Sequence, residues 1–185
     1  MTLEQKIAGV TEITLRDKDG NAKSLWAENT VGKWVRRVLG FDLKGWSAMG
    51  HWADCLVHAN TITNVGHAGA NGRISNQGGY NPFVNIAIGT GTQGTPATAT
   101  ALASETTTAG GGRAASTASQ VTTSVSNDTT QLQHTWTFSG PLAITEEGIF
   151  DSATASTGNM FAYQSFSAIN VVNTDQLTVT HKYQT

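Results

Sequence analysis

The stretch FSGPLAITEEGIFDSATASTGNMFAYQSFSAINVVNTDQLTVTHKY, residues 138–183, decides the fold of this 185-residue chain. It consists of short segments in which apolar and polar residues alternate, separated by turn-forming residues. Its last segment, 176–183, carries on one face Leu177, Val179, His181 and Tyr183. A period of two is typical of a half-buried β-strand. We therefore expect the end of this stretch to be a structural strand rather than a loose tail.

Alternating segments recur along the rest of the chain at intervals of roughly 8–12 residues. They cover residues 10–17, 22–27, 83–89, 120–126, 131–138, 143–150, 160–166 and 168–172. Asp19-Gly20 and Asn127-Asp128 are turn-forming pairs, so we expect a hairpin around each of them. Many short strands with a turn at each break predict a mainly β fold, an antiparallel β-sandwich or a jelly-roll-like barrel. The chain is long enough to form one such domain over residues 1–185.

Alternation also predicts which side chains of these strands face the core. The first strand should place on one face Thr11, Ile13 and Leu15. For the second hairpin the inward candidates are Val121, Val125, Leu132, Trp136 and Phe138.

One segment has the period of a helix. Its apolar positions recur at i, i+3, i+4, i+7 and i+8, and they are Val31, Trp34, Val35, Val38 and Leu39. We expect one short helix at about 31–39, with Asn29 or Thr30 capping its start. Gly40 can end it. Because so short a helix gains little from its own propensity, this apolar stripe should pack onto a sheet.

Three segments lack a regular pattern. Residues 1–9 should form an N-terminal arm. Residues 41–82 are rich in Trp, His and Gly and should form a long irregular insert, with one short strand or helix around 53–57, ordered against a neighbour. Residues 94–118 are rich in Thr, Ala and Gly, with Leu102 as their one large apolar residue. We expect this last segment to lie extended on a surface without entering the core.

The composition indicates a chain that other proteins cover. Charged residues make up 13% of the sequence, against an ordinary share of about 25%. Small hydroxyl side chains lose little conformational entropy when a partner covers them, and a weakly charged surface does not repel neighbours. A Thr-rich secreted β-protein would have a similar composition, and it stays open as an alternative interpretation.

Charge and hydropathy exclude several classes of partner. The net charge is −2, and Lys33, Arg36 and Arg37 are the only tight basic group, so nucleic acid is not an expected partner. No apolar run reaches the ~18 residues of a membrane helix. The first residues lack the apolar core of a signal peptide, so we expect synthesis in a cytoplasm. Cys55 is the single cysteine and excludes an internal disulfide.

Two motifs suggest catalysis or cofactor binding but lack the context that either needs. GTGTQG at 89–94 matches G-x-G-x-x-G, yet the TPATAT that follows has no helical apolar stripe to open a dinucleotide-binding helix. Glu146 and Glu147 are adjacent on a strand, so they point to opposite faces and cannot act on one bond. One of them is better suited to bind turn amides near Gly148.

The remaining candidates are histidines, the cysteine and the tryptophans. Asp54 and His58, with His51, could present metal ligands only on a helix, and core or interface roles suit them better. Cys55 has no partner that would make it a nucleophile. We expect no catalytic, cofactor or metal residues and no enzyme activity. Among the tryptophans, Trp34 and Trp136 fall in core patterns, and the possible exposed interface anchors are Trp46 and Trp52.

Several segments resemble a group of short bacteriophage virion structural proteins, the head-decoration or cement, neck and tail-fibre-like proteins. The segments are VNIAIGTGT (84–92), TALASE (100–105), AITEEGIFD (143–151) and MFAYQSFSAINVVNTDQLTVTHKY (160–183), with ITLRDKDGN (13–21) as a weaker match. The resemblance covers 83–183 well and 10–22 weakly, and it does not cover 41–82. It implies a structural protein of the virus particle and brings no catalytic residues.

Composition and resemblance together give the functional expectation. It is a virion protein, made in the host cytoplasm, that decorates or cements the capsid shell as a homo-oligomer bound to the major capsid protein. Residues 1–9 and 94–118 are the expected contact segments. A neck or tail adaptor, or a tail-fibre attachment protein, is an alternative within the particle. A carbohydrate-binding module that uses Trp46 and Trp52 is an alternative of another class.

Overall fold

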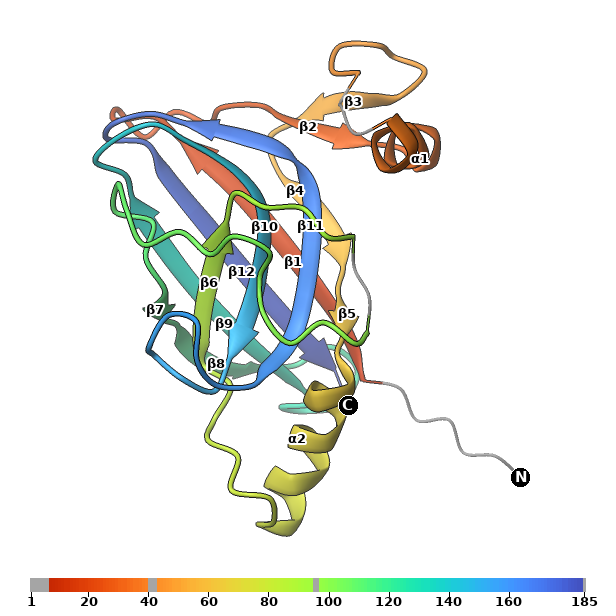
Figure 1. Ribbon diagram of the computed structural model, residues 1–185, viewed down its shortest axis with the longest axis vertical. Helices are drawn as coiled ribbons and strands as arrows, with labels where there is room; N and C mark the ends of the chain where they lie inside the picture. The colour runs from red at the N-terminus through yellow and green to blue at the C-terminus, as the bar shows by residue number, and fades with distance from the viewer. Residues whose placement is uncertain (1–6, 40–42, 95–96, 185) are drawn as a thin grey trace.

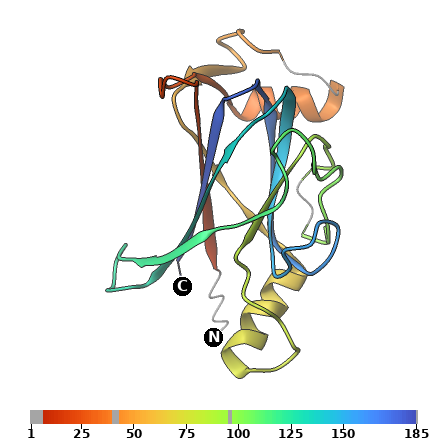
Figure 2. The ribbon, with the colours of Figure 1, turned by 90° about the vertical axis from the view of Figure 1, so that its left-hand side faces the viewer.

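The chain folds into two antiparallel sheets packed face to face. The computed structural model describes residues 7–39, 43–94 and 97–184 (Figure 1). One sheet has the strand order β4-β1-β12-β9-β8 and the other β5-β11-β10-β6-β7, and β2 pairs with β3 in a small third sheet. Figure 2 shows the two large sheets edge-on, as the two layers of a sandwich. The predicted mainly β, sandwich-like class is confirmed.

The strands are short and two helices interrupt them in the described residues. The strands are β1 (Ala8–Arg16), β2 (Leu25–Glu28), β3 (Gly50–Ala53), β4 (Leu56–Ala59), β5 (Thr61–Ile62), β6 (Asn85–Gly89), β7 (Ala114–Ala115), β8 (Thr117–Val121), β9 (Thr129–Thr137), β10 (Leu142–Phe150), β11 (Met160–Val171) and β12 (Gln176–Gln184). The helices are α1 (Thr30–Leu39) and α2 (Asn64–Ser75). Neither helix, nor any other in the described ranges, is long and apolar enough to cross a membrane.

The alternation of the strands explains the core. Inward residues of both sheets meet between the layers, among them Ile13, Leu56, Ile86, Ile144, Ile149, Phe166, Leu177 and Val179. The last strand, β12, lies between β1 and β9, so the C-terminal segment is a central strand as predicted. The face of β1 that carries Ile13 and the face of β12 that carries Leu177 are the buried ones.

Several predicted boundaries need correction. The turn after β1 forms, but β2 pairs with β3 and only a single bridge, Arg16 to Ala22, continues the expected hairpin. Segments 160–166 and 168–172 form one strand, β11. The hairpin around Asn127-Asp128 forms between β8 and β9, although Val125 is 68% exposed because the turn begins before it.

The segment between β6 and β7 also differs from expectation, because part of it enters a core. It crosses the outer face of the second sheet, where it is drawn in green in Figure 1. Ala99 and Leu102 are buried there against Phe150, Met160 and Tyr163. That second sheet is therefore covered on both faces, which explains why β6 and β11 are apolar along most of their length.

Residues 43–82 of the insert form regular elements, where a mostly irregular structure was predicted. They contribute β3, β4, β5 and α2, and the chain crosses from one large sheet to the other between β4 and β5. Of the predicted arm, residues 1–6 lie outside the described residues, and β1 begins at Ala8.

Helix α2 lacks an apolar stripe and is held by close backbone packing instead. Thr63 caps its start by accepting the Gly66 N–H at 2.8 Å. The buried face consists of Gly66, Gly69 and Gly72. A Cβ on Gly66 would lie 2.1 Å from the carbonyl oxygen of Phe161 in β11. Glycine at this position therefore permits the helix to approach the strand.

Replacing Gly66 with alanine should lower the free energy of unfolding by about 3 kcal/mol, because helix or strand must move to admit the methyl group. Denaturant unfolding measures the change. Asn71→Ala, at an exposed position of the same helix, is the control and should leave stability unchanged or slightly raised. Equal stability of the two variants would contradict the close packing.

Candidate binding surface at one end of the sandwich

Helix α1 and strands β2 and β3 form a small unit that extends beyond one end of the sandwich, opposite to α2 (Figure 1). Asn29 starts the helix by accepting the Gly32 N–H at 2.9 Å, and its amide donates to the Ala48 carbonyl at 2.8 Å. Trp26 is 5% exposed and lies edge-to-face with Trp52, with ring centroids 5.5 Å apart. These contacts fix the helix against the β2–β3 pair.

Close packing at Gly32 decides which face of α1 points inward. A Cβ there would lie 2.2 Å from the Met49 carbonyl oxygen, and of the helix only Gly32 and Val35 are buried. The helix forms where it was predicted, but the orientation predicted for its apolar stripe is wrong. Four stripe residues are 51–62% exposed, and they are Val31, Trp34, Val38 and Leu39.

Exposed apolar side chains concentrate on this unit. Trp46 and Trp52 are 62% and 57% exposed, so both are accessible, and their role as interface anchors stays a prediction. With the four residues of α1 they make up six of the ten exposed large hydrophobic residues in the described part of the chain. We call these six residues the α1–β3 surface. A concentration of this kind is typical of a site where another molecule binds.

The charges beside this surface are mainly basic. Lys33 and Arg37 are exposed on α1, while Arg36 contacts the Glu28 carboxylate at 2.9 Å. Tryptophan and arginine are the residue types most often found at the energetic centre of protein interfaces. The α1–β3 surface therefore has the composition of a protein-binding site.

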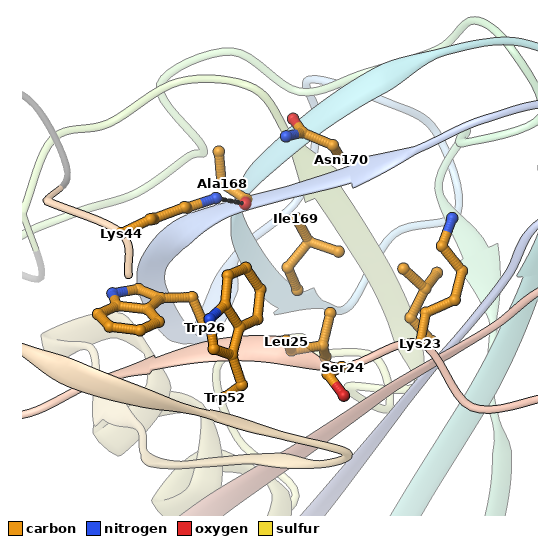
Figure 3. A pocket seen from close by; sticks show the side chains of 10 residues that line it. Lys23, Ser24, Leu25, Trp26, Lys44, Trp52, Ala168, Ile169 and Asn170 are labelled. Atoms are coloured by element: carbon orange, nitrogen blue, oxygen red, sulfur yellow. Dashed lines mark hydrogen bonds between the residues drawn. The ribbon is translucent and has the colours of Figure 1, made fainter. Parts of the chain in front are cut away.

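A hollow of about 200 Å³ separates this unit from the sandwich (Figure 3). Its walls include Leu25, Trp26, Trp52, Lys44, Ile169 and Asn170. Lys44 donates to the Ala168 carbonyl across it. Trp52 lines the hollow but Trp46 does not, so the two predicted anchors do not share one cavity.

The adjacent carboxylates of β10 point to opposite sides, as predicted. Glu146 faces outward and binds the segment that covers the sheet. The predicted binding of amides near Gly148 is wrong for this residue. Glu146 accepts the N–H groups of Gly91, Ala103 and Ser104 at 2.7–3.1 Å and the Tyr163 hydroxyl at 2.9 Å. Burial, together with the neighbouring Glu146, raises the pKa of Tyr163, so its phenol remains a hydrogen-bond donor.

Glu147 faces the interior and joins the two large sheets. Its carboxylate lies 2.9 Å from His181 Nε2 and accepts the Thr11 hydroxyl at 3.1 Å. Thr11 also lies 3.1 Å from His181 Nδ1. A hydroxyl, an imidazole and a carboxylate in this order resemble a nucleophilic triad. All three residues are 0% exposed, so a substrate has no access to the hydroxyl and the cluster is structural.

The remaining candidates do not converge on one site. His51 is exposed on β3, whereas His58 faces the core from β4 and stacks on Phe166. No three metal-ligating side chains come together within the described ranges. Cys55 is half-buried, and burial raises the pKa of its thiol, which disfavours the reactive thiolate.

His58 makes folding dependent on pH. Burial, and secondarily the charges of Lys33 and Arg36 of α1, lower its pKa to about 4. The unfolded chain, with an ordinary histidine pKa, then binds more protons than the folded chain between about pH 4 and 6.5. The free energy of unfolding therefore falls as the pH drops through this window.

His58→Phe should remove this dependence, because a neutral ring replaces a group that must stay unprotonated. The stability of the variant relative to the natural chain should rise by about 3 kcal/mol between pH 7 and pH 4. Urea unfolding across this range measures the difference, with His67→Gln on the exposed face of α2 as control. Parallel stability profiles for His58→Phe and the natural chain would contradict the assignment.

Comparison with known proteins gives no relative of this chain. No protein-family model, no curated protein and no solved structure matches it.

Proposed function

We propose that this chain is a bacteriophage virion structural protein that decorates or cements the capsid shell by binding the major capsid protein. It does so as a homo-oligomer, and the α1–β3 surface is the part that contacts the shell. The observation that carries the proposal is the concentration of six exposed apolar side chains on one projecting unit. The resemblance of residues 83–183 to short phage virion proteins supports the particle as its location.

The physical role follows from the contrast between this unit and the rest of the molecule. Burying tryptophan and aliphatic side chains gives an interface most of its free energy. The two buried carboxylates of β10, Glu146 and Glu147, already have partners within the chain. Binding would therefore stabilise a shell by covering apolar area at a junction, without a chemical step.

The contact segments expected from sequence need revision within this proposal. Part of the segment 94–118 covers the second sheet, with Ala99 and Leu102 buried, so this part is not free to contact a partner. The α1–β3 surface replaces this segment as the primary contact. A neck or tail adaptor would use the same surface in a few copies per particle, whereas shell decoration requires hundreds.

Trp34→Ser with Val38→Ser should weaken binding to purified, undecorated shells by at least about 30-fold, because two exposed anchors are lost. Co-sedimentation with the shells measures the affinity. Both side chains are more than half exposed, so the unfolding transition should not change.

The matched control is Ile74→Ser with Val172→Ser, which removes two exposed apolar side chains outside the α1–β3 surface. This control should bind shells like the natural chain. Equal binding by both double variants would contradict the role of the surface.

A carbohydrate-binding module is the second candidate, and the hollow beside Trp52 favours it. An aromatic ring next to polar groups such as Asn170 and Ser24 suits a sugar. Glycan-array binding that Trp52→Ala abolishes and Trp34→Ser preserves would favour this candidate over shell decoration.

A further inference from the structure

We propose that β8 is a pairing edge at which a second copy of this chain adds its own β8, in antiparallel orientation, across a two-fold axis. This inference deepens the homo-oligomeric part of the function proposed above and rests on it. It does not depend on binding to a shell.

Strand β8 is the outer strand of its sheet. On one side it pairs with β9, from Thr117 with Gln133 to Val121 with Thr129. No hydrogen bond from the described residues reaches the other side of this strand. Figure 2 shows the β8–β9 hairpin, in green, projecting sideways from the sandwich, and four of the five residues of β8 are exposed. Residues 117–121 therefore leave one edge of the strand without a backbone partner among the described residues.

The alternation of the ladder identifies the backbone groups that face outward. Ser116 donates its N–H to the Val84 carbonyl at 2.8 Å, on the side away from β9. Every second residue of a strand uses the same edge. Ala118 and Gln120 therefore direct their N–H and C=O groups to the open edge.

The edge lacks the charged residues and prolines with which many proteins prevent strand addition. Lysine, proline and inward charges normally block such an edge. Residues 114–127, AASTASQVTTSVSN, contain no proline and no charged residue. The open edge of β8 is therefore available for pairing.

Charge and symmetry commit this edge to a second copy rather than to another protein. In the paired strand, β9, there is likewise no Asp, Glu, Lys or Arg. Asp128, at the hairpin tip, is occupied by the N–H groups of Thr123, Ser124 and Val125 at 2.8–2.9 Å. The uncharged β8–β9 hairpin of one copy is compatible with the same uncharged hairpin of a second copy. A two-fold axis would pair two strands of equal length. The β4-β1-β12-β9-β8 sheets of the two copies would then become one continuous sheet.

The test is self-association of the purified full chain, measured by sedimentation velocity over a wide concentration range. The natural chain should be a dimer. Ala118→Lys with Gln120→Lys should raise the dimer dissociation constant at least about 100-fold, because the charges of the two copies would face each other. Thr100→Lys with Thr107→Lys, at exposed positions without side-chain hydrogen bonds, adds the same charge elsewhere and should remain dimeric.

Hydrogen exchange of the natural chain gives a second readout that does not require a folded variant. The amides of Ala118 and Gln120 should exchange more slowly as the concentration rises. A monomeric natural chain, or a dimer that the β8 double variant leaves unchanged, would overturn the proposal. A natural chain that is a dimer but does not bind shells would instead contradict the proposed function and leave the β8 pairing intact.

Discussion

The rest of the structure depends on two neighbouring carboxylates that a β-strand must direct to opposite sides. Glu147 reaches into the sandwich and contacts His181 of the facing sheet at 2.9 Å, with both side chains almost fully buried. Glu146 reaches outward and binds three backbone N–H groups of the covering segment. A buried carboxylate without such partners would be strongly destabilising. These two residues therefore fix the spacing of the sheets and the path of the chain over them.

Because several acidic residues are buried, the charge of the surface differs from the net charge of the chain. The net charge of the chain is −2, but three of its acidic side chains, Glu146, Glu147 and Asp151, are buried. The surface is therefore less acidic than the composition indicates. Near α1 it is basic and apolar together, which suits contact with a partner that has acidic groups around an apolar patch.

Patterns that depend on alternation were predictable from sequence, whereas contacts made through glycine were not. The inward face of β12 follows from its period of two, and α1 from its period of 3.6. The apolar stripe did not indicate which face of α1 points inward, because close packing at Gly32 decides this orientation. The available signal was the glycine itself, because glycine in a short helix marks close approach to backbone.

Helix α2 and the covering segment also depend on contacts that no local sequence pattern predicts. The buried residues of α2 are Gly66, Gly69 and Gly72, so hydropathy could not reveal this helix. Leu102 is buried because Glu146 holds the loop that carries it, a contact over 42 residues of sequence. Pairing of β2 with β3 instead of β1 likewise depends on distant residues.

The most direct measurement of the central claim is cryo-electron microscopy of intact particles that contain this chain. The account predicts density for the β-sandwich on the shell, with α1 and β3 buried against the major capsid protein. Particles in which the chain is present but α1 and β3 face solvent would contradict it.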